Sequence, residues 1–231
     1  MSSSRKVVEL FYDVVSPYSW LGFEILCRYK TVWNIELQLR PAFLGGVIKE
    51  SGNSSAALVP NKLLYARSDL KRLSQYFSVL LCFPENFHNA YAKGSLSAMR
   101  FLTAVSEKQN SGDVMFERVS RDLEKNITLC ISVLCKAGLK AGLSATEVEE
   151  LLQLSKCQLV KDRLKLTTEE AVKHMAFGFP LIVCHVDGKA ETFFGSDRFE
   201  VMAHCIGKHR QLGSALQSVT SRQPSGAGLF K

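Results

Sequence analysis

A strand pattern passes directly into a helix pattern at Asp13-Val14-Val15-Ser16-Pro17-Tyr18-Ser19-Trp20. Residues 7–12 just before it are mostly β-branched, aromatic or otherwise apolar, which is typical of a short buried strand. In residues 21–30 after it, apolar side chains recur at helical spacing. Ser16 followed by Pro17 is a strong helix-start signal, with Ser16 at the N-cap and Pro17 at the first helical position. The sequence therefore predicts a strand whose C-terminal end leads straight into the N-terminus of a helix.

The strand–helix junction has features that could bind an anion. The first N–H groups of a helix have no partner within the helix, and the helix dipole places partial positive charge beside them. An anion at Ser16 would meet backbone donors, a hydroxyl donor and a favourable field together. The alternative is that Ser16 only caps its own helix, which needs no ligand, and the junction alone leaves both interpretations open.

Composition is that of an ordinary globular chain. Its 231 residues suit one large domain or two small ones, and no apolar stretch is long enough to span a membrane. The net charge is +7, and the lysines and arginines are interspersed with acidic residues. This pattern argues against a nucleic-acid-binding stripe, whereas the positive net charge favours small anionic ligands. The seven cysteines lack metal-ligand spacing and indicate a reducing compartment with few disulfides.

The order of patterns along the chain indicates an α/β fold with a helical interruption. Residues 35–40 alternate with period two, so the first three elements form a βαβ unit with parallel strands. Residues 43–60 are rich in Gly and Ser and predict a loop near Ser16. Residues 61–176 show helical patterns only, including one after Gly94-Ser95.

The strand pattern resumes near the C-terminus. Residues 179–186 predict an apolar strand led by Pro180, and Asp187-Gly188 predicts a tight hairpin to residues 190–194. We expect Gly195-Ser196-Asp197 to start a last helix. These patterns divide the chain into residues 1–60 and 176–213 of one domain, a helical insertion at 61–175, and a disordered tail at 214–231.

This order resembles the thioredoxin fold, a βαβ–ββα domain whose periplasmic thiol oxidoreductases carry a helical insertion at the same place. Those proteins have a CxxC at the junction, whereas this chain has Ser16-Pro17-Tyr18-Ser19, so thiol–disulfide exchange by a dithiol is excluded. Several motifs, in register over residues 7–207, resemble those of the kappa-class glutathione transferases, which are related to 2-hydroxychromene-2-carboxylate isomerases. The matching motifs are Phe11-Tyr12-Asp13-Val14-Val15-Ser16-Pro17-Tyr18-Ser19-Trp20-Leu21-Gly22, Gly52-Asn53, Lys93-Gly94-Ser95-Leu96-Ser97-Ala98-Met99-Arg100-Phe101-Leu102, and Phe194-Gly195-Ser196-Asp197-Arg198.

The resemblance implies a glutathione transferase. Its co-substrate is glutathione, no metal takes part, and Ser16 is the catalytic residue that holds the glutathione sulfur as a thiolate. The thiolate would attack a small hydrophobic electrophile such as a halo-aromatic, or reduce a hydroperoxide. A glutathione-dependent isomerase, a non-catalytic glutathione- or partner-binding protein, and an inert structural relative remain alternatives.

The resemblance also implies which residues bind glutathione, with Ser16, Pro17 and Tyr18 at the junction. Phe179, before a cis Pro180, would offer its backbone to the cysteinyl unit. Ser196 and Asp197 would bind the γ-glutamyl group, unless they only cap a helix, and Asn53 and Lys62 would bind the glycine end, unless Lys62 is only a solvated lysine. Tyr18 and Trp20 are candidates for the acceptor pocket, although Trp20 could equally belong to the core.

The remaining expectations concern assembly and location. The resemblance implies a homodimer in the mitochondrial matrix or the peroxisome, and the charge distribution predicts that the protein binds no nucleic acid. The C-terminal Leu229-Phe230-Lys231 is not a Ser-Lys-Leu type signal, so the cytosol remains a further alternative.

Overall fold

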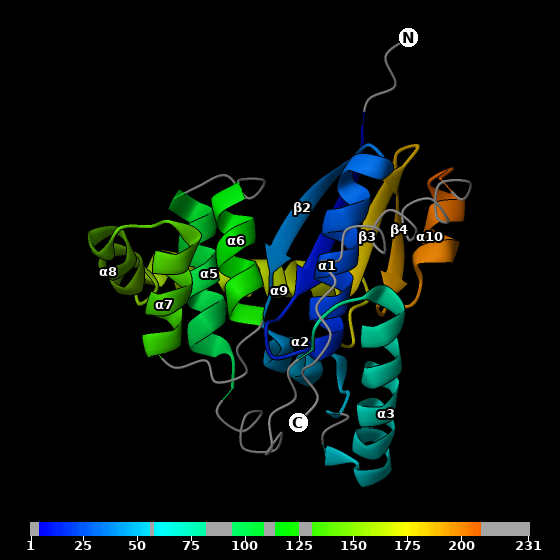
Figure 1. Cartoon of the computed structure of the whole chain (residues 1–231), viewed down its shortest axis with the longest axis horizontal. Coiled ribbons are helices and arrows are strands. Elements are labelled where there is room, and N and C mark those ends of the chain that lie inside the picture. Colours follow the sequence, from blue (N-terminus) through cyan, green and yellow to red (C-terminus); the bar gives the residue numbers. More distant parts are fainter. Residues whose placement is uncertain (1–4, 56–57, 82–93, 109–113, 125–130, 209–231) are drawn as a thin grey trace, which may run out of the picture.

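A computed structural model describes residues 5–55, 58–81, 94–108, 114–124 and 131–208, and these form one mixed sheet with helices around it (Figure 1). The sheet has the order β2-β1-β3-β4, with β1 and β2 parallel and the other two pairs antiparallel. The strands are β1 Lys6–Tyr12, β2 Ile35–Pro41, β3 Leu181–Val186 and β4 Lys189–Phe194. The predicted βαβ–ββα order is therefore confirmed.

The described helices lie in the predicted segments, apart from α2 and the start of α10. They are α1 Pro17–Val32, α2 Leu44–Ser51, α3 Pro60–Phe77, α5 Leu96–Lys108, α6 Val114–Glu124, α7 Ile131–Ala141, α8 Ala145–Leu154, α9 Gln158–Lys173 and α10 Phe199–Cys205. None of the helices in the described ranges is both long and apolar enough to cross a bilayer. The predicted tail at 214–231 lies outside the described residues, and the domain boundaries stay a prediction.

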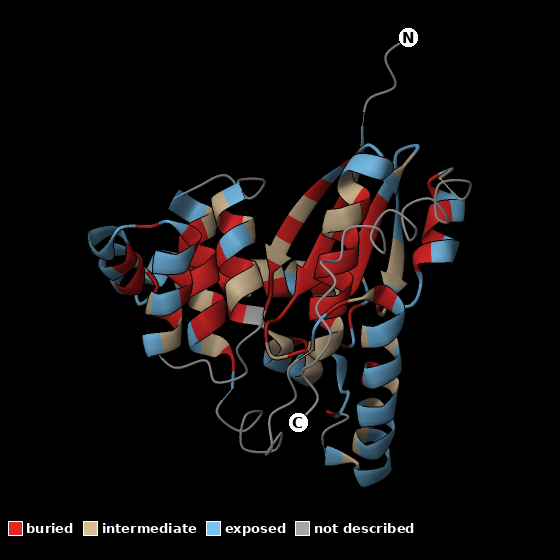
Figure 2. Cartoon of the chain, in the orientation of Figure 1, coloured by how far each residue is buried: buried red, intermediate tan, exposed pale blue. Residues whose placement is uncertain are grey.

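The alternation of side chains along β1 divides the core between the two faces of the sheet. Val8, Leu10 and Tyr12 pack on the face covered by α1, whereas Phe11 packs on the opposite face with residues of α2 and α9. Figure 2 shows the buried residues concentrated in the sheet, in α1 and in the helices that face them. The strand–helix junction after β1 is thus held between two packed layers.

The turn between β3 and β4 follows the sequence pattern. Asp187 and Gly188 have φ values of 50° and 79°, the left-handed conformations of the tight hairpin turn that Asp-Gly favours. This turn fixes the register in which Leu181 pairs with Phe194. It therefore places the start of β3 next to the end of β4.

Helix α2 lies where the sequence predicted a loop, and that part of the prediction is wrong. Gly45 and Gly46 lower the intrinsic helix propensity, but tertiary packing overrides propensity here. A Cβ on Gly46 would come 2.9 Å from Thr168 Cγ2, so glycine lets α2 pack closely against α9. Gly46, one of the glycines that indicated a loop, is therefore a packing residue.

The helical insertion is tied to the first strand and helix by polar contacts as well as apolar ones. The Tyr12 hydroxyl and the Ser120 hydroxyl are hydrogen-bonded at 2.8 Å, and both side chains are fully buried. Arg121 of α6 forms an ion pair with Glu24 of α1. Figure 1 shows α5–α8 on one side of the sheet and α3 projecting from the opposite side of the molecule.

Candidate active site

A cavity of about 730 Å³ opens at the C-terminal end of β1, where α1 begins. Its volume falls in the range of roughly 300–1,000 Å³ that is typical of small-molecule sites. All nine residues expected to bind glutathione line this cavity, although they come from five segments of the chain. They are Ser16, Pro17, Tyr18, Asn53, Lys62, Phe179, Pro180, Ser196 and Asp197.

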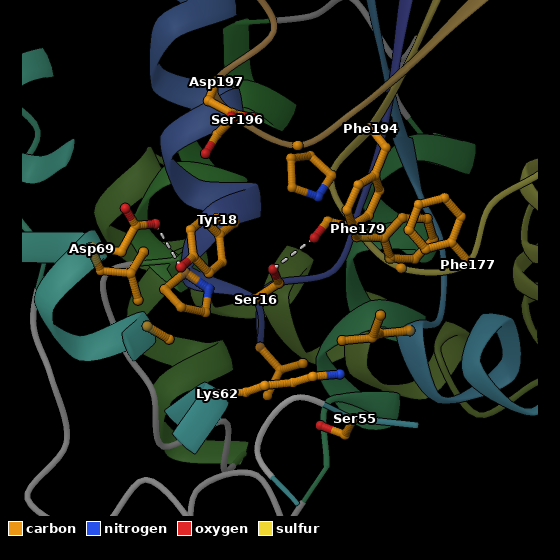
Figure 3. Close-up of a pocket in the computed structure, with 18 of the residues that line it drawn as sticks. Ser16, Tyr18, Ser55, Lys62, Asp69, Phe177, Phe179, Phe194, Ser196 and Asp197 are labelled. Carbon is orange, nitrogen blue, oxygen red and sulfur yellow. Dashed lines mark hydrogen bonds between the residues drawn. The ribbon is translucent and has the colours of Figure 1, made fainter. Parts of the chain in front are cut away.

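Ser16 lies in the middle of the cavity beside Phe179, with Ser196 at one end and Lys62 at the other (Figure 3). Ser16 is the N-cap of α1 and is only 7% exposed. Its Oγ accepts a hydrogen bond from the Ser19 N–H at 3.2 Å and donates one to the Phe179 carbonyl oxygen at 3.2 Å. The capping interpretation is therefore confirmed, and the same hydroxyl also lines the cavity.

The loop before Ser16 is organised by Asp13, which the sequence did not mark as a site residue. Its side chain is fully buried and accepts hydrogen bonds from the Val15 N–H, the Leu44 N–H and the Ser95 hydroxyl. Burial raises the pKa of this carboxyl to about 6, although the three hydrogen bonds oppose the shift. Asp13 is thus ionised for the most part at neutral pH.

The Phe179–Pro180 peptide bond is cis, as the resemblance implied. Gly22 on α1 allows the approach of this loop, because a Cβ there would come 3.2 Å from the Pro180 ring. The Pro180 carbonyl accepts a hydrogen bond from the Gly195 N–H at 3.0 Å. The loop that carries Phe179 is therefore held between α1 and the end of β4, facing Ser16.

Ser196 and Asp197 lie in a turn, not in the first turn of a helix. Helix α10 begins at Phe199 with Arg198 as its N-cap, so the prediction that Ser196 and Asp197 start this helix is wrong. Gly195 just before them has a φ of 101°, which turns the chain out of β4. The Ser196 hydroxyl is buried and has no hydrogen-bond partner within the described structure, although it belongs to a residue that lines the cavity.

Asn53 joins the segment after α2 to the loop before β3. Its Nδ2 donates to the Phe177 carbonyl oxygen at 2.6 Å, and its Oδ1 accepts from the Ser54 N–H at 2.8 Å. Lys62 in the first turn of α3 is exposed and lines the same end of the cavity. The side chains at this end therefore supply an amide and a cation.

The two aromatic residues expected in the acceptor pocket have different positions. Tyr18 lines the cavity, and its hydroxyl donates to Asp69 at 2.9 Å. Burial, reinforced by this carboxylate, raises the pKa of the Tyr18 phenol, so it stays neutral. Trp20 is only 3% exposed, is not one of the lining residues, and donates its indole N–H to the Leu80 carbonyl. The expectation that Trp20 lines the acceptor pocket is therefore wrong, and Trp20 belongs to the core.

An aromatic pair that the sequence analysis missed lies on the side of Ser16 opposite Tyr18 (Figure 3). Phe177 and Phe194 line the cavity with ring centroids 4.2 Å apart, and they remain 46% and 39% exposed. Gly178 makes room for this pair, because a Cβ there would come 3.1 Å from the Phe194 ring. Each phenylalanine precedes a glycine, and Phe194 also opens one of the motifs that match the family, but neither signal places a side chain in the cavity.

The site contains no cluster of three or more His, Cys, Asp or Glu side chains suited to a metal ion, as far as the described residues extend. Its charged lining residues are the cations Lys62, Arg67 and Arg198 and the carboxylates Asp69 and Asp197. The cavity thus combines separated charges, apolar walls and a hydroxyl at a helix N-terminus.

Comparison with known proteins identifies the family. The DSBA-like thioredoxin domain family matches residues 7–207. The chain is 47% identical to "Glutathione S-transferase kappa 1" of Homo sapiens over 230 residues, which covers 96% of this chain and 100% of that protein. It is 46% identical to the Rattus norvegicus protein of the same name, covering 90% and 94% of the two chains. A solved structure of a 2-hydroxychromene-2-carboxylate isomerase has the same fold, with a TM-score of 0.63 at 22% identity over 91% of this chain and 98% of that one. With this fold, a serine in place of a dithiol at the head of α1, and this level of identity, the chain belongs to the kappa-class glutathione S-transferases within the DSBA-like thioredoxin domain family.

Proposed function

We propose that this protein is a glutathione transferase that binds glutathione along the cavity and ionises its thiol at Ser16. The observation that carries the proposal is the position of the Ser16 hydroxyl at the N-terminus of α1, on the wall of a 730 Å³ cavity. The names of the relatives support glutathione as the co-substrate. No metal is needed for this chemistry.

The free energy available at Ser16 matches what thiol activation requires. A thiol with an ordinary pKa is mostly protonated near neutral pH, and lowering that pKa by ~2 units requires ~2.7 kcal/mol. A charge-assisted hydrogen bond from the Ser16 hydroxyl supplies ~1.5–3 kcal/mol, and the dipole of α1 adds up to ~1 kcal/mol. The two effects together cover the requirement, so no general base has to remove the proton within the site.

Glutathione binding would also release the Ser16 hydroxyl for this task. In the structure this hydroxyl donates to the Phe179 carbonyl oxygen. The cysteinyl N–H of a peptide lying along Phe179 can donate to the same carbonyl, which leaves the Ser16 hydroxyl free to turn toward the sulfur. The ligand thereby replaces one donor of that carbonyl, and no buried acceptor loses its partner.

The two ends of the cavity suit the two ends of the tripeptide. The buried Ser196 hydroxyl, which lacks a partner within the described structure, and the Asp197 carboxylate fit the α-carboxylate and ammonium of a γ-glutamyl group. At the other end, Lys62 provides a positive charge for the glycine carboxylate. A buried polar atom without a partner is costly, so the Ser196 hydroxyl supports a polar ligand at this position.

The second substrate is a small hydrophobic electrophile, and the exposed Phe177–Phe194 pair is the surface proposed to bind it. Planar aromatic molecules pack well on such rings, and each stacked pair contributes ~0.5–1.5 kcal/mol beyond the buried area. With a halo-aromatic, the thiolate sulfur forms a bond to the ring carbon and halide leaves. With a hydroperoxide, the thiolate attacks the terminal oxygen and releases an alcohol, and a second glutathione converts the sulfenic acid to disulfide and water.

A thiolate titration tests the proposal directly. The ultraviolet absorbance of bound glutathione is measured against pH for the wild type and for Ser16→Ala, with calorimetry to measure glutathione affinity. We expect a bound thiol pKa well below its free value in the wild type and a shift upward in Ser16→Ala. Tight binding with an unshifted thiol pKa in the wild type would instead support a non-catalytic binding protein, and no binding would support an inert relative. Parallel assays with a chromene carboxylic acid and a halo-aromatic separate an isomerase from a transferase.

The assembly and location of the protein are part of the same proposal and rest on the resemblance. A homodimer that detoxifies electrophiles in the mitochondrial matrix or the peroxisome is expected, with the cytosol as the alternative. Sedimentation of the purified chain and fractionation of cells that express it would test these two expectations.

A further inference from the structure

The carboxylate of Asp13 lies where three parts of the fold meet. It is fully buried between the β1–α1 loop, the start of α2 and the start of α5. Oδ1 accepts from the Val15 N–H at 3.0 Å, while Oδ2 accepts from the Leu44 N–H at 2.8 Å and from the Ser95 hydroxyl at 2.7 Å. Every donor is neutral, and no ion pair to Asp13 is found among residues 5–55, 58–81, 94–108, 114–124 and 131–208.

These hydrogen bonds fix the backbone immediately before the N-cap. The Asp13 carbonyl oxygen accepts from the Ser16 N–H at 2.9 Å, and the Asp13 side chain holds the intervening Val15 N–H. Both bonds close the same turn, so the Asp13 carboxylate supports the backbone that carries the Ser16 hydroxyl. The Leu44 N–H and the Ser95 hydroxyl in turn fix that orientation.

Ser95 belongs to the Gly94-Ser95-Leu96 motif, which has no contact with the cavity. Gly94 has a φ of 69°, and Ser95 is 2% exposed just before α5. The side chain of Ser95 therefore points inward to Asp13, away from solvent. This gives the helical insertion a direct contact with the loop that carries the proposed catalytic serine.

We propose that Asp13 is a positioning residue for Ser16, and that Ser95 of the helical insertion holds Asp13 in the orientation that aims the Ser16 hydroxyl into the cavity. The catalytic consequence of this inference rests on the proposed glutathione transferase function. The structural consequence, a rigid turn at Val15 and Ser16, is independent of that function. A competing explanation is that the Asp13–Ser95 contact only docks the insertion on the sheet.

Ser120 provides a matched control, because its hydroxyl bonds to Tyr12, the residue next to Asp13. Ser95→Ala and Ser120→Ala each remove one buried hydroxyl that links the insertion to residues 12–13, but only Ser95→Ala removes a bond to Asp13. Asp13→Asn is the stronger variant, because an amide cannot accept on the side where its NH2 group lies. Thermal unfolding of each variant establishes that it is folded.

The first measurement is amide hydrogen exchange at Val15 and Ser16, which needs no glutathione. We expect Ser95→Ala to accelerate exchange at both amides by at least ~10-fold, and Ser120→Ala to change it by less than about twofold. Equal acceleration in the two serine variants, or none in either, would overturn the proposal, because the contact would then only dock the insertion or do nothing for the turn.

The second measurement is steady-state kinetics with glutathione and a halo-aromatic. We expect Ser95→Ala to lower kcat by ~10- to 100-fold with little change in the KM for glutathione, as for a displaced catalytic group. Ser120→Ala should keep the wild-type kcat. A Ser95→Ala enzyme that loosens the turn yet keeps its kcat would overturn the catalytic part of the inference. A wild-type protein without transferase activity would contradict the proposed function, whereas the exchange experiment would still decide the positioning role.

Discussion

Replacing Ser16 by alanine tests the central step of the proposed mechanism, the stabilisation of a glutathione thiolate at the head of α1. The substitution removes one hydroxyl that now bonds to the Phe179 carbonyl and to the Ser19 N–H. It leaves Pro17, the backbone N–H groups of the first helical turn and the dipole of α1 in place. The expected loss is therefore the hydroxyl contribution alone, about 1.5–3 kcal/mol.

This loss can be expressed as a pH-dependent change in rate. If the wild type lowers the thiol pKa from ~8.5 to ~6.5, loss of about 2 kcal/mol returns it to ~8 in Ser16→Ala. The ionised fraction at pH 6 then falls ~25-fold, whereas at pH 8.5 it falls less than about twofold. The difference between the two proteins should therefore shrink steadily as the pH rises.

The assay is conjugation of saturating glutathione to a halo-aromatic between pH 5.5 and 9, together with calorimetric glutathione binding. Glutathione affinity should stay within a few-fold, because most of the proposed binding contacts lie elsewhere in the cavity. Loss of the N-cap also costs about 0.5–2 kcal/mol of stability, so thermal unfolding must establish that the variant is folded over this range. Ser19→Ala is the control, because the Ser19 hydroxyl is buried in the same helical turn, has no hydrogen-bond partner within the described structure and does not line the cavity. Identical pH–rate profiles for Ser16→Ala and the wild type would refute the reasoning.

Three further substitutions test the other parts of the site. Asp197→Asn should raise the KM for glutathione ~5- to 30-fold without lowering kcat, because it weakens a binding contact that is the same in ground and transition states. A glutathione analogue without the α-amino group should show no such difference between the two proteins. Phe194→Ala should raise the KM for a planar halo-aromatic ~3- to 10-fold and leave glutathione affinity unchanged. Its control is Tyr76→Ala, which should change neither value because Tyr76 is an exposed aromatic residue that does not line the cavity. Finally, the folded-state pKa of Asp13 is raised from 3.8 to about 6, so the folded protein binds more protons than the unfolded chain between these values. The contribution of Asp13 to stability therefore falls by ~2 kcal/mol as the pH rises from 4 to 6, and Asp13→Asn should lack this component when the free energy of unfolding is measured by urea titration across that range.

The parts of the fold that the sequence predicted are those specified by neighbouring residues. Ser16-Pro17 at a strand–helix junction and Asp187-Gly188 between two strands each carry their backbone geometry in their own chemistry, and the structure has both as expected. The capping box that Ser144 and Glu147 form at the start of α8 is another local feature of this kind. In each case the deciding interactions span four residues or fewer.

The features that the sequence could not predict depend on contacts between distant segments. The Gly46 backbone is helical because of its packing against Thr168 in α9, more than a hundred residues later in the chain. Glu9 is an acid in the middle of a buried strand, and its partners are Arg40 on β2 and His185 on β3. A local pattern contains neither partner, so it can give no reason for a buried charge at that position.

The residues of the site also separate into those that the sequence predicted and those that depend on contacts between distant segments. Similarity to a family placed nine lining residues correctly without any knowledge of their contacts. It did not predict Phe177 and Phe194, whose pairing requires the β3–β4 register and the space left by Gly178. The sequence left Trp20 open between the acceptor pocket and the core, because an aromatic residue near a reactive position has the same sequence pattern in either environment.

The serine in place of a dithiol changes what the rest of the cavity has to do. A protein thiol at the head of α1 would be fixed by its own backbone, whereas a glutathione sulfur must be brought there and oriented by contacts elsewhere. In the proposed mechanism, Ser16 stabilises the charge only if the peptide is held along Phe179, between Ser196 and Lys62, and only if the Ser16 hydroxyl points to the sulfur. The first requirement agrees with lining residues that come from five segments of the chain, and under the proposed positioning role the second gives the buried acid Asp13 a task that offsets the cost of its desolvation. Both requirements follow from moving the reactive sulfur from the protein to its ligand.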